Sequence, residues 1–233
     1  MPQEPPDLLS EETLPSAVAE LVGRDRDLAA IVERFGPPPL WARPPGFETL
    51  VQIMLEQQVS LASAFAAYER LRRVIDPVTP EAFLLLTDAE LLTIGFSHQK
   101  ARYVRSLARA LLTGGRDLAR LASLPDEEVH RELVGLTGVG PWTAAIYMME
   151  ALLRPDLWPV ADIALATSVA AVKGLAVRPG PAEMEVIGEA WRPWRSVAAR
   201  LFWHDYLGRR GRSALIPAPA PMLAPMPATE RTA

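Results

Sequence analysis

Apolar residues recur every three or four positions along most of the chain, which is the period of an amphipathic helix. No stretch shows the apolar–polar alternation of a half-buried strand. Glycine and proline interrupt the pattern, most firmly at Gly36-Pro37-Pro38-Pro39 and at Asp76-Pro77. The pattern predicts an all-α fold with helices over residues 17–35, 47–75, 80–86, 88–93, 98–113, 116–121, a helix beginning near 125, and residues 141–153, 162–173, 181–190 and 193–207.

The two ends of the chain differ from the rest in composition. From Ser213 onward alanine and proline dominate, and a segment with so few packable groups is expected to stay disordered. The first residues, Met-Pro-Gln-Glu-Pro-Pro, are similar. We expect residues 1–14 and 213–233 to be disordered and the rest to fold, since a chain of 233 residues is long enough to bury a substantial core.

Composition narrows the class of protein. The chain has no cysteine, which excludes disulfides, thiol catalysis and cysteine-bound zinc or iron–sulfur clusters. His98, His130 and His204 are scattered without metal-ligand spacing, so we expect no catalytic metal and no cofactor. The sequence shows neither a signal peptide nor an apolar run long enough to span a bilayer. We expect a cytoplasmic protein without a membrane partner, and nothing in the sequence demands more than a monomer.

One short segment predicts an anion-binding turn. The stretch from Leu136 to Ala145 reads Leu-Thr-Gly-Val-Gly-Pro-Trp-Thr-Ala-Ala. Gly138 and Gly140 permit a tight turn with uncovered peptide N–H groups, and Pro141 suits the first position of a helix. A helix N-terminus with bare N–H groups binds phosphate.

A basic segment precedes this turn. The net charge of −4 argues against a protein that coats nucleic acid non-specifically, but it allows a local basic face. Between residues 98 and 120 basic side chains outnumber the single acid, Asp117; they are Lys100, Arg102, Arg105, Arg109, Arg116 and Arg120. A solvated helix face has the same composition. Beside a phosphate-binding turn, we favour contact with a DNA backbone.

Asp162 is the candidate catalytic residue. It ends the segment Trp-Pro-Val-Ala-Asp and precedes an apolar helix. One interpretation is a helix N-cap, because an aspartate in this position accepts backbone N–H groups. The other is a carboxylate in an apolar cleft, where it stabilises positive charge that develops on a substrate.

Five separated segments carry a family resemblance. They are Gln57-Gln58-Val59-Ser60, Gly95-Phe96-Ser97-His98-Gln99-Lys100-Ala101, the glycine turn, Asp162, and Trp191-Arg192-Pro193-Trp194-Arg195-Ser196. In this order they resemble the helix-hairpin-helix DNA glycosylases over residues 17–207. The similarity is greatest to the bacterial 3-methyladenine DNA glycosylase II family, in the short form without an N-terminal β domain.

The resemblance implies two helical subdomains with an active-site cleft between them and the hairpin at the lip of the cleft. Residues 15–45 and 145–212 would form the terminal subdomain, and residues 46–144 the central one. Asp162 matches the catalytic aspartate of the family, which would stabilise positive charge at C1′ and orient the attacking water.

The resemblance also assigns a base pocket to Trp142, Trp203 and Gln58. Trp142 occupies the position at which bifunctional relatives carry a lysine nucleophile, so we expect no lyase reaction. Trp203 would stack on an electron-poor base. Plain helix packing is the alternative for both tryptophans, and hydrogen bonding between helices is the alternative for the glutamines.

The expected DNA contacts are Ser60, His98, Lys100, Gly138, Val139, Gly140 and Thr143. His98 falls at the position of the wedge that fills the gap left by a flipped base, although such wedges are usually apolar, and a surface histidine is the alternative. By the same resemblance, the carbonyls of Leu136 and Val139 would hold a structural Na⁺ or K⁺.

Two positions depart from the family. Ile146 and Ile163 stand where some relatives carry pocket tyrosines, which leaves the range of substrates open. Cationic bases such as 3-methyladenine leave readily, whereas neutral lesions such as hypoxanthine need a proton donor that the sequence does not identify.

The resemblance therefore predicts a monofunctional DNA glycosylase that flips alkylated purines out of double-stranded DNA and hydrolyses the N-glycosidic bond. The alternative is a non-catalytic helix-hairpin-helix module that binds damaged DNA and needs no acid at Asp162. An 8-oxoguanine-type glycosylase/lyase is a third interpretation, which Trp142 disfavours.

Overall fold

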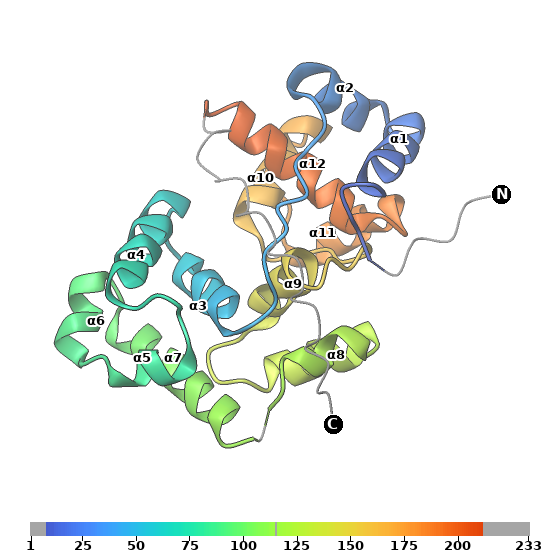
Figure 1. Ribbon diagram of the computed structural model, residues 1–233. Helices are drawn as coiled ribbons and strands as arrows, with labels where there is room; N and C mark the ends of the chain where they lie inside the picture. The colour runs from blue at the N-terminus through green and yellow to red at the C-terminus, as the bar shows by residue number, and fades with distance from the viewer. Residues whose placement is uncertain (1–7, 115, 212–233) are drawn as a thin grey trace.

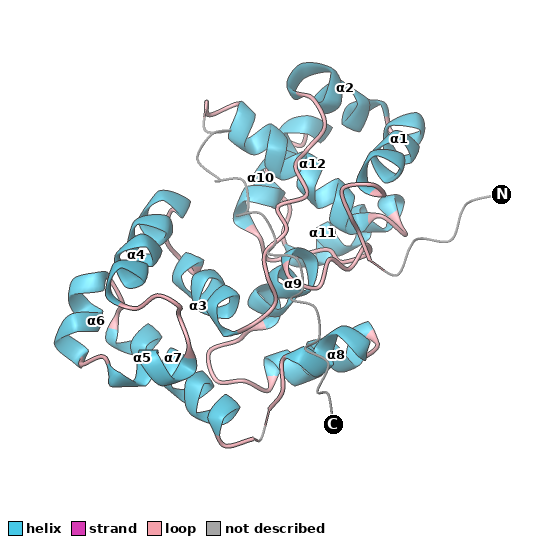
Figure 2. Ribbon diagram, viewed as in Figure 1, coloured by secondary structure: helices cyan, strands magenta, loops and turns pink. Residues whose placement is uncertain are grey.

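The computed structural model describes residues 8–114 and 116–211 (Figure 1). Helices and the loops between them make up all of this part of the chain, and it contains no strand (Figure 2). Two clusters of buried apolar residues divide it into a central and a terminal subdomain. The prediction of an all-α fold is confirmed.

The central subdomain surrounds one very apolar helix, α3. Val51, Ile53 and Met54 of this helix are completely buried, because neighbouring helices cover it on several sides. The helices of this subdomain are α3 (Phe47–Glu56), α4 (Leu61–Val74), α5 (Pro80–Leu85), α6 (Asp88–Ile94), α7 (His98–Leu112), α8 (Asp126–Val134) and α9 (Pro141–Glu150), with a 3-10 turn at Ala119–Ser123.

The terminal subdomain is built around α12 in the same way. Its helices are α1 (Leu14–Arg24), α2 (Arg26–Phe35), α10 (Ile163–Lys173), α11 (Pro181–Gly188) and α12 (Arg195–Gly208), with a 3-10 turn at Glu189–Trp191. The guanidinium of Arg200 is buried in α12 and donates to the carbonyls of Leu40, Ser196 and Met149 at 2.8, 3.0 and 2.6 Å. This one side chain therefore ties three segments of the chain together.

Two predicted long helices are each broken into two. The predicted helix over residues 17–35 ends and restarts at Asp25, whose carboxylate accepts the N–H groups of Asp27 and Leu28 as an N-cap. The predicted helix over residues 47–75 is interrupted at residues 57–60, where Gln58 has a φ of 58°. The apolar spacing continues across both breaks, so it does not reveal them.

The predicted ends of the ordered region need one correction. Leu9 is 1% exposed, and its N–H donates to the carbonyl of Leu153 at 2.7 Å, so the expected disorder is wrong for residues 8–14. Residues 1–7 and the predicted tail at 213–233 lie outside the described residues.

The predicted subdomain boundary between residues 144 and 145 falls inside α9. The buried side chains of Ile146, Tyr147 and Met148 pack in the central cluster, whereas Met149 packs in the terminal one. Helix α9 therefore belongs mainly to the central subdomain and lies where the central and terminal subdomains meet (Figure 1). No described helix is both long and apolar enough to cross a membrane.

Candidate active site

A cleft of about 2160 Å³ opens between the two subdomains. The central subdomain contributes α3, α4, the glycine turn and α9 to its walls. The terminal subdomain contributes Ala161, Ile163, Ala164 and the end of α12, and residues 41–46 of the segment that joins α2 to α3 also line the cleft. The predicted cleft is therefore present, and the glycine turn lies on its wall.

Asp162 is the N-cap of α10, and its chain neighbours Ala161 and Ile163 line the cleft. Its Oδ1 accepts the N–H of Leu165 at 2.7 Å, which caps α10. Its Oδ2 accepts the indole N–H of Trp142 at 2.8 Å, and Oδ1 lies 3.3 Å from the indole nitrogen of Trp203. Asp162 as a whole is 9% exposed, and three N–H donors lie around its carboxylate. The N-cap interpretation of Asp162 is confirmed, and the catalytic one stays a prediction.

The structure brings together the three residues that the sequence singles out for base binding and catalysis. Trp142 comes from the first turn of α9, Trp203 from α12 and Asp162 from the start of α10. Both tryptophans are half-buried and line the cleft. Each indole therefore offers a ring surface to the cleft and an N–H to the carboxylate.

A third tryptophan was not predicted from the sequence. Trp41 lines the cleft, and its ring centroid lies 6.5 Å from that of Trp203. Its φ of 51° is a strained, left-handed conformation for a residue with a side chain. The segment around it carries no motif, and its φ is set by tertiary packing, so the sequence gives no signal for it.

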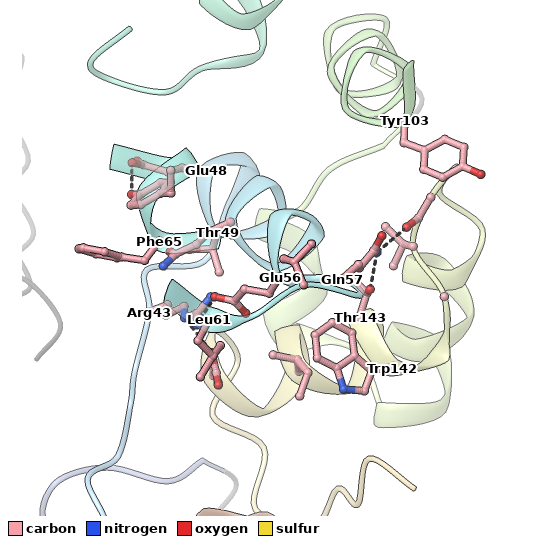
Figure 3. Close-up of a pocket in the computed structure, with 18 of the residues that line it drawn as sticks. Arg43, Glu48, Thr49, Glu56, Gln57, Leu61, Phe65, Tyr103, Trp142 and Thr143 are labelled. Carbon is pink, nitrogen blue, oxygen red and sulfur yellow. Dashed lines mark hydrogen bonds and ion pairs between the residues drawn. The ribbon is translucent and has the colours of Figure 1, made fainter. Parts of the chain in front are cut away.

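The glycine turn is held from two sides. Gly138 has a φ of +88°, and a Cβ there would lie 2.6 Å from the Cβ of Tyr103 on α7. The side-chain amide of Gln57 donates to the Gly138 carbonyl at 3.0 Å and to the Thr143 hydroxyl at 2.8 Å. Figure 3 shows Gln57 reaching from α3 to Thr143, with Trp142 beside it. Gln57 therefore fixes the turn to α3.

Its neighbour Gln58 lies differently. The sequence places Gln58 inside a helix, but it stands in the turn between α3 and α4, where it is exposed and lines the cleft. Ser60 follows in the same turn and accepts the N–H of Ser63, which caps α4. The predicted contact of Gln58 with a base stays a prediction, and the interhelical bonding considered for the pair belongs to Gln57.

Some expected DNA contacts do not hold as predicted. Thr143 is 1% exposed and its hydroxyl accepts a hydrogen bond from Gln57, so it supports the turn from the protein interior. The N–H of Val139 donates to the Leu136 carbonyl at 3.1 Å within the turn. The N–H groups of Gly138 and Gly140 make no hydrogen bond to a described residue, and these two remain suited to phosphate.

Lys100 is also placed otherwise than expected. Its ammonium donates to the carbonyls of Leu55 and Gln57 at 2.7 and 2.8 Å and so caps the C-terminal end of α3. Burial lowers the pKa of Lys100. Lys100 is therefore engaged within the protein, and its predicted contact with DNA stays a prediction. His98 is exposed at the start of α7, and its predicted role as a wedge stays a prediction.

The arginines of the predicted basic face fall into two groups, those paired with acids and those that are exposed. Arg105 pairs with Asp88, and Arg116 pairs with Glu132. Arg102, Arg109 and Arg120 are exposed. The part of the basic segment that can meet a DNA backbone is therefore smaller than its composition implies.

Charged side chains that were not predicted as site residues also line the cleft. The guanidinium of Arg43 lies 2.9 Å from a carboxylate oxygen of Glu56 and 2.8 Å from one of Glu150. Figure 3 shows Arg43 and Glu56 pointing toward each other beneath α3. Burial raises the pKa of Glu150 to about 7; the charges of Glu56 and Asp162 add to this, and those of Arg43 and Arg200 oppose it.

The sequence held one signal for Glu150. Trp142, Ile146 and Glu150 follow each other at intervals of four, so they share one face of α9, and all three line the cleft. Tyr147 points away from the cleft, is fully buried and accepts the N–H of Gly46. It does not replace the tyrosines that Ile146 and Ile163 leave absent.

No group of three or more His, Asp or Glu side chains in the described part of the chain is arranged to hold a metal ion. In the glycine turn, the Leu136 carbonyl already accepts the N–H of Val139. A monovalent cation on the carbonyls of Leu136 and Val139 stays a prediction.

Comparison with known proteins agrees with this geometry. The family model for HhH-GPD superfamily base excision DNA repair proteins matches residues 51–195. The Bacillus subtilis protein YfjP is 29% identical over 186 residues, which are 76% of this chain and 65% of that protein. A DNA-3-methyladenine glycosylase of the same organism is 26% identical over 169 residues, 67% of this chain and 56% of that protein. The chain thus spans less than two thirds of either relative.

A solved structure shows the same fold. The Schizosaccharomyces pombe 3-methyladenine DNA glycosylase Mag1, in complex with abasic DNA, superposes with a TM-score of 0.75 at 23% identity. The match covers 81% of this chain and 95% of that one.

Proposed function

Since the chain belongs to the HhH-GPD superfamily of base excision DNA repair proteins, we propose that it is a monofunctional DNA glycosylase. It flips an alkylated purine of the 3-methyladenine type out of double-stranded DNA and hydrolyses the N-glycosidic bond. The observation that carries this proposal is the Asp162 carboxylate, which two indole N–H groups hold beside a cleft. A module that only binds DNA has no need for that arrangement.

The chemistry follows from the charge that develops on the sugar. When the bond from C1′ to the base breaks, its electron pair leaves with the base, and positive charge appears on C1′ and the ring oxygen. A fixed carboxylate at this point stabilises the charge and orients or deprotonates the attacking water. Asp162 suits this role because its three donors prevent it from turning away.

The tryptophans would bind the flipped base. The rings of Trp41, Trp142 and Trp203 line the cleft, and aromatic faces attract electron-poor, cationic bases. Ile146 and Ile163 also line the cleft. They are smaller than tyrosines and offer a base less stacking surface, so the cleft leaves room for purines of different shape.

The DNA backbone would be held by the glycine turn and by exposed arginines. The N–H groups of Gly138 and Gly140 suit one phosphate, and a cation at the carbonyls of Leu136 and Val139 would strengthen this contact. Arg102 and Arg109 on α7 supply exposed positive charge. Affinity for DNA should therefore fall as salt rises.

The positions of both lysines support hydrolysis without a lyase step. A lyase needs a free amine beside C1′. Lys100 is engaged with the end of α3, and Lys173 lies 2.8 Å from Asp25 and 2.9 Å from Asp27. Treatment of the reacting complex with borohydride should therefore trap no crosslink to DNA.

The decisive experiment compares the wild type with Asp162→Asn on alkylated duplex DNA. Asparagine is also a good N-cap, so the variant should keep α10 and still bind DNA. We expect the wild type to release free 3-methyladenine. The single-turnover rate of the variant should be lower by about 100-fold or more. If the wild type binds alkylated DNA but releases no base, the protein is a recognition module and the proposal is wrong.

A further inference from the structure

The side chain of Gln57 bridges two parts of the site. Its amide nitrogen carries two N–H groups and makes two hydrogen bonds, to the Gly138 carbonyl at 3.0 Å and to the Thr143 hydroxyl at 2.8 Å. A carbonyl can only accept, so the nitrogen of the amide must face the turn. Gly138 belongs to the turn that is proposed to bind phosphate, and Thr143 belongs to the first turn of α9 (Figure 3).

Helix α7 holds this bridge in place from both ends. The ammonium of Lys100 donates to the backbone carbonyl of Gln57 at 2.8 Å and to that of Leu55 at 2.7 Å. Three positions further along α7, the side chain of Tyr103 packs against Gly138 and leaves no room for a Cβ there. Residues three apart share one face of a helix, so one face of α7 supports both the base of the bridge and the turn.

The other end of the bridge lies next to a residue that holds Asp162. Thr143 is buried and its hydroxyl meets Gln57 in the protein interior. Trp142 precedes it in the same helical turn, lines the cleft and donates to the Asp162 carboxylate at 2.8 Å. A shift of Thr143 therefore moves Trp142 with it and changes the support of the carboxylate.

The polypeptide alone does not fix the distance between the turn and α9. It joins them through Val139, Gly140 and Pro141, and a glycine has access to more backbone conformations than other residues. The bridge removes this freedom, because one side chain holds Gly138 and Thr143 at the same time.

We propose that Gln57 is a positioning residue, which fixes the phosphate-binding turn relative to Trp142 and Asp162. This inference rests on the proposed glycosylase function. The bound phosphate and the reacting sugar belong to one DNA strand, so the distance from the turn to Asp162 sets the distance from C1′ to the carboxylate. A misplacement of about 1 Å can lower a rate by about 100-fold.

Thr143→Val tests the arm of the bridge that reaches α9, because valine keeps the shape of threonine and lacks the hydroxyl. We expect the single-turnover rate of 3-methyladenine release at saturating protein to fall by about 10-fold or more. The dissociation constant for DNA with an abasic site should change by less than about 2-fold, because the arm to Gly138 remains. Thr143→Ser is the matched variant, and its hydroxyl should recover most of the rate.

Gln57→Leu removes both arms. The turn then loses its tie to α3, so both the rate at saturating protein and the affinity for DNA should fall. A residue that only stabilises the fold would lower the urea midpoint and leave the rate of the folded, DNA-bound protein unchanged.

The same substitutions in a Trp142→Phe background identify the path of the effect. Phenylalanine has no N–H for Asp162, so Thr143→Val or Gln57→Leu should lower the rate by much less there than in the wild type. Gln57→Leu gives this comparison even if Thr143→Val folds poorly.

Two results would overturn the role of Gln57 and leave the glycosylase proposal intact. One is an unchanged rate at saturating protein in Gln57→Leu. The other is an equal fall in the wild-type and Trp142→Phe backgrounds. Release of no base by the wild type would remove both proposals.

Discussion

The two tryptophans beside Asp162 hold its carboxylate at different distances. The indole nitrogen of Trp142 lies 2.8 Å from Oδ2, whereas that of Trp203 lies 3.3 Å from Oδ1, which also accepts the N–H of Leu165. Hydrogen bonds to charged groups are worth about 1.5–3 kcal/mol, and the shorter one is the stronger. Trp142 should therefore contribute more to the position of the carboxylate.

Phenylalanine at either position keeps an aromatic ring and removes the N–H. We expect Trp142→Phe to lower the single-turnover rate of 3-methyladenine release by about 10-fold or more, because Oδ2 loses its donor. Trp203→Phe should lower it by less. Affinity for DNA with an abasic site should change little in both variants. A larger loss in Trp203→Phe would show that stacking on Trp203 outweighs the positioning by Trp142.

At the scale of single residues, the sequence identified the site residues that belong to motifs and missed those that only tertiary packing places in the cleft. Asp162, Trp142 and Trp203 were found because they stand at motif positions, and the structure brings them together. Trp41 and Arg43 lie in a segment without a motif, and only the folded chain places them in the cleft. Lys100 was assigned to DNA on its charge, but it caps α3 because the carbonyls of Leu55 and Gln57 lie within its reach.

At the scale of elements, the glycine turn is a rigid unit. Gly138 packs against Tyr103 with a φ of +88°, and Gln57 ties its carbonyl to α3. Gly140 has an ordinary φ of −89°, and nothing lies within 4 Å of the Cβ that it lacks. The two glycines therefore serve different purposes: the first is needed for the fold, and the second keeps one surface of the turn open.

Alanine at each position separates the two purposes. Gly138→Ala should lower the free energy of unfolding by about 1–3 kcal/mol, since its Cβ meets Tyr103 and its φ is unfavourable. Gly140→Ala should unfold like the wild type but bind duplex DNA about 10-fold more weakly, because the methyl group covers the phosphate site. Urea unfolding and DNA titration at one fixed salt concentration measure the two effects. Unchanged DNA binding by Gly140→Ala would place the phosphate elsewhere.

The helices themselves were largely predictable, and their breaks were not. The period of apolar residues locates the helical segments, but a chain can leave a helix for one turn without losing that period. At Asp25 and at residues 57–60 the break depends on a cap and on a left-handed residue, Gln58. A capping aspartate inside an apparent helix is a readable signal, whereas the conformation of Gln58 depends on the fold around it.

At the scale of the whole molecule, the cleft exists because two cores meet at α9. The family resemblance predicted this arrangement, but the boundary that it predicted falls within α9. No boundary can divide this helix cleanly, because it supplies Tyr147 to one core and Met149 to the other. Arg200 and Arg43 then join the cores with buried charge. The stability of the whole molecule should therefore respond to the charge state of this junction.

Glu150 makes that response measurable. Its pKa is about 7 in the folded protein against 4.5 for an ordinary glutamate, so between these values the folded state binds more protons than the unfolded state. The free energy of unfolding should therefore fall as pH rises from about 5 to 7.5, by about 1–3 kcal/mol, and level off above. The opposite case, Asp25, has a lowered pKa, and its contribution is lost below pH 4, outside this window.

Glu150→Gln isolates this effect from every other titrating group. Glutamine cannot ionise, so the variant should lose the slope between pH 5 and 7.5, and the difference in unfolding free energy between variant and wild type should shift in favour of the variant as pH rises. Urea unfolding at half-unit intervals of pH gives both curves. Parallel curves would mean that Glu150 stays ionised throughout the range, held so by Arg43 and Arg200. In that case the junction between the cores would be a permanent ion cluster.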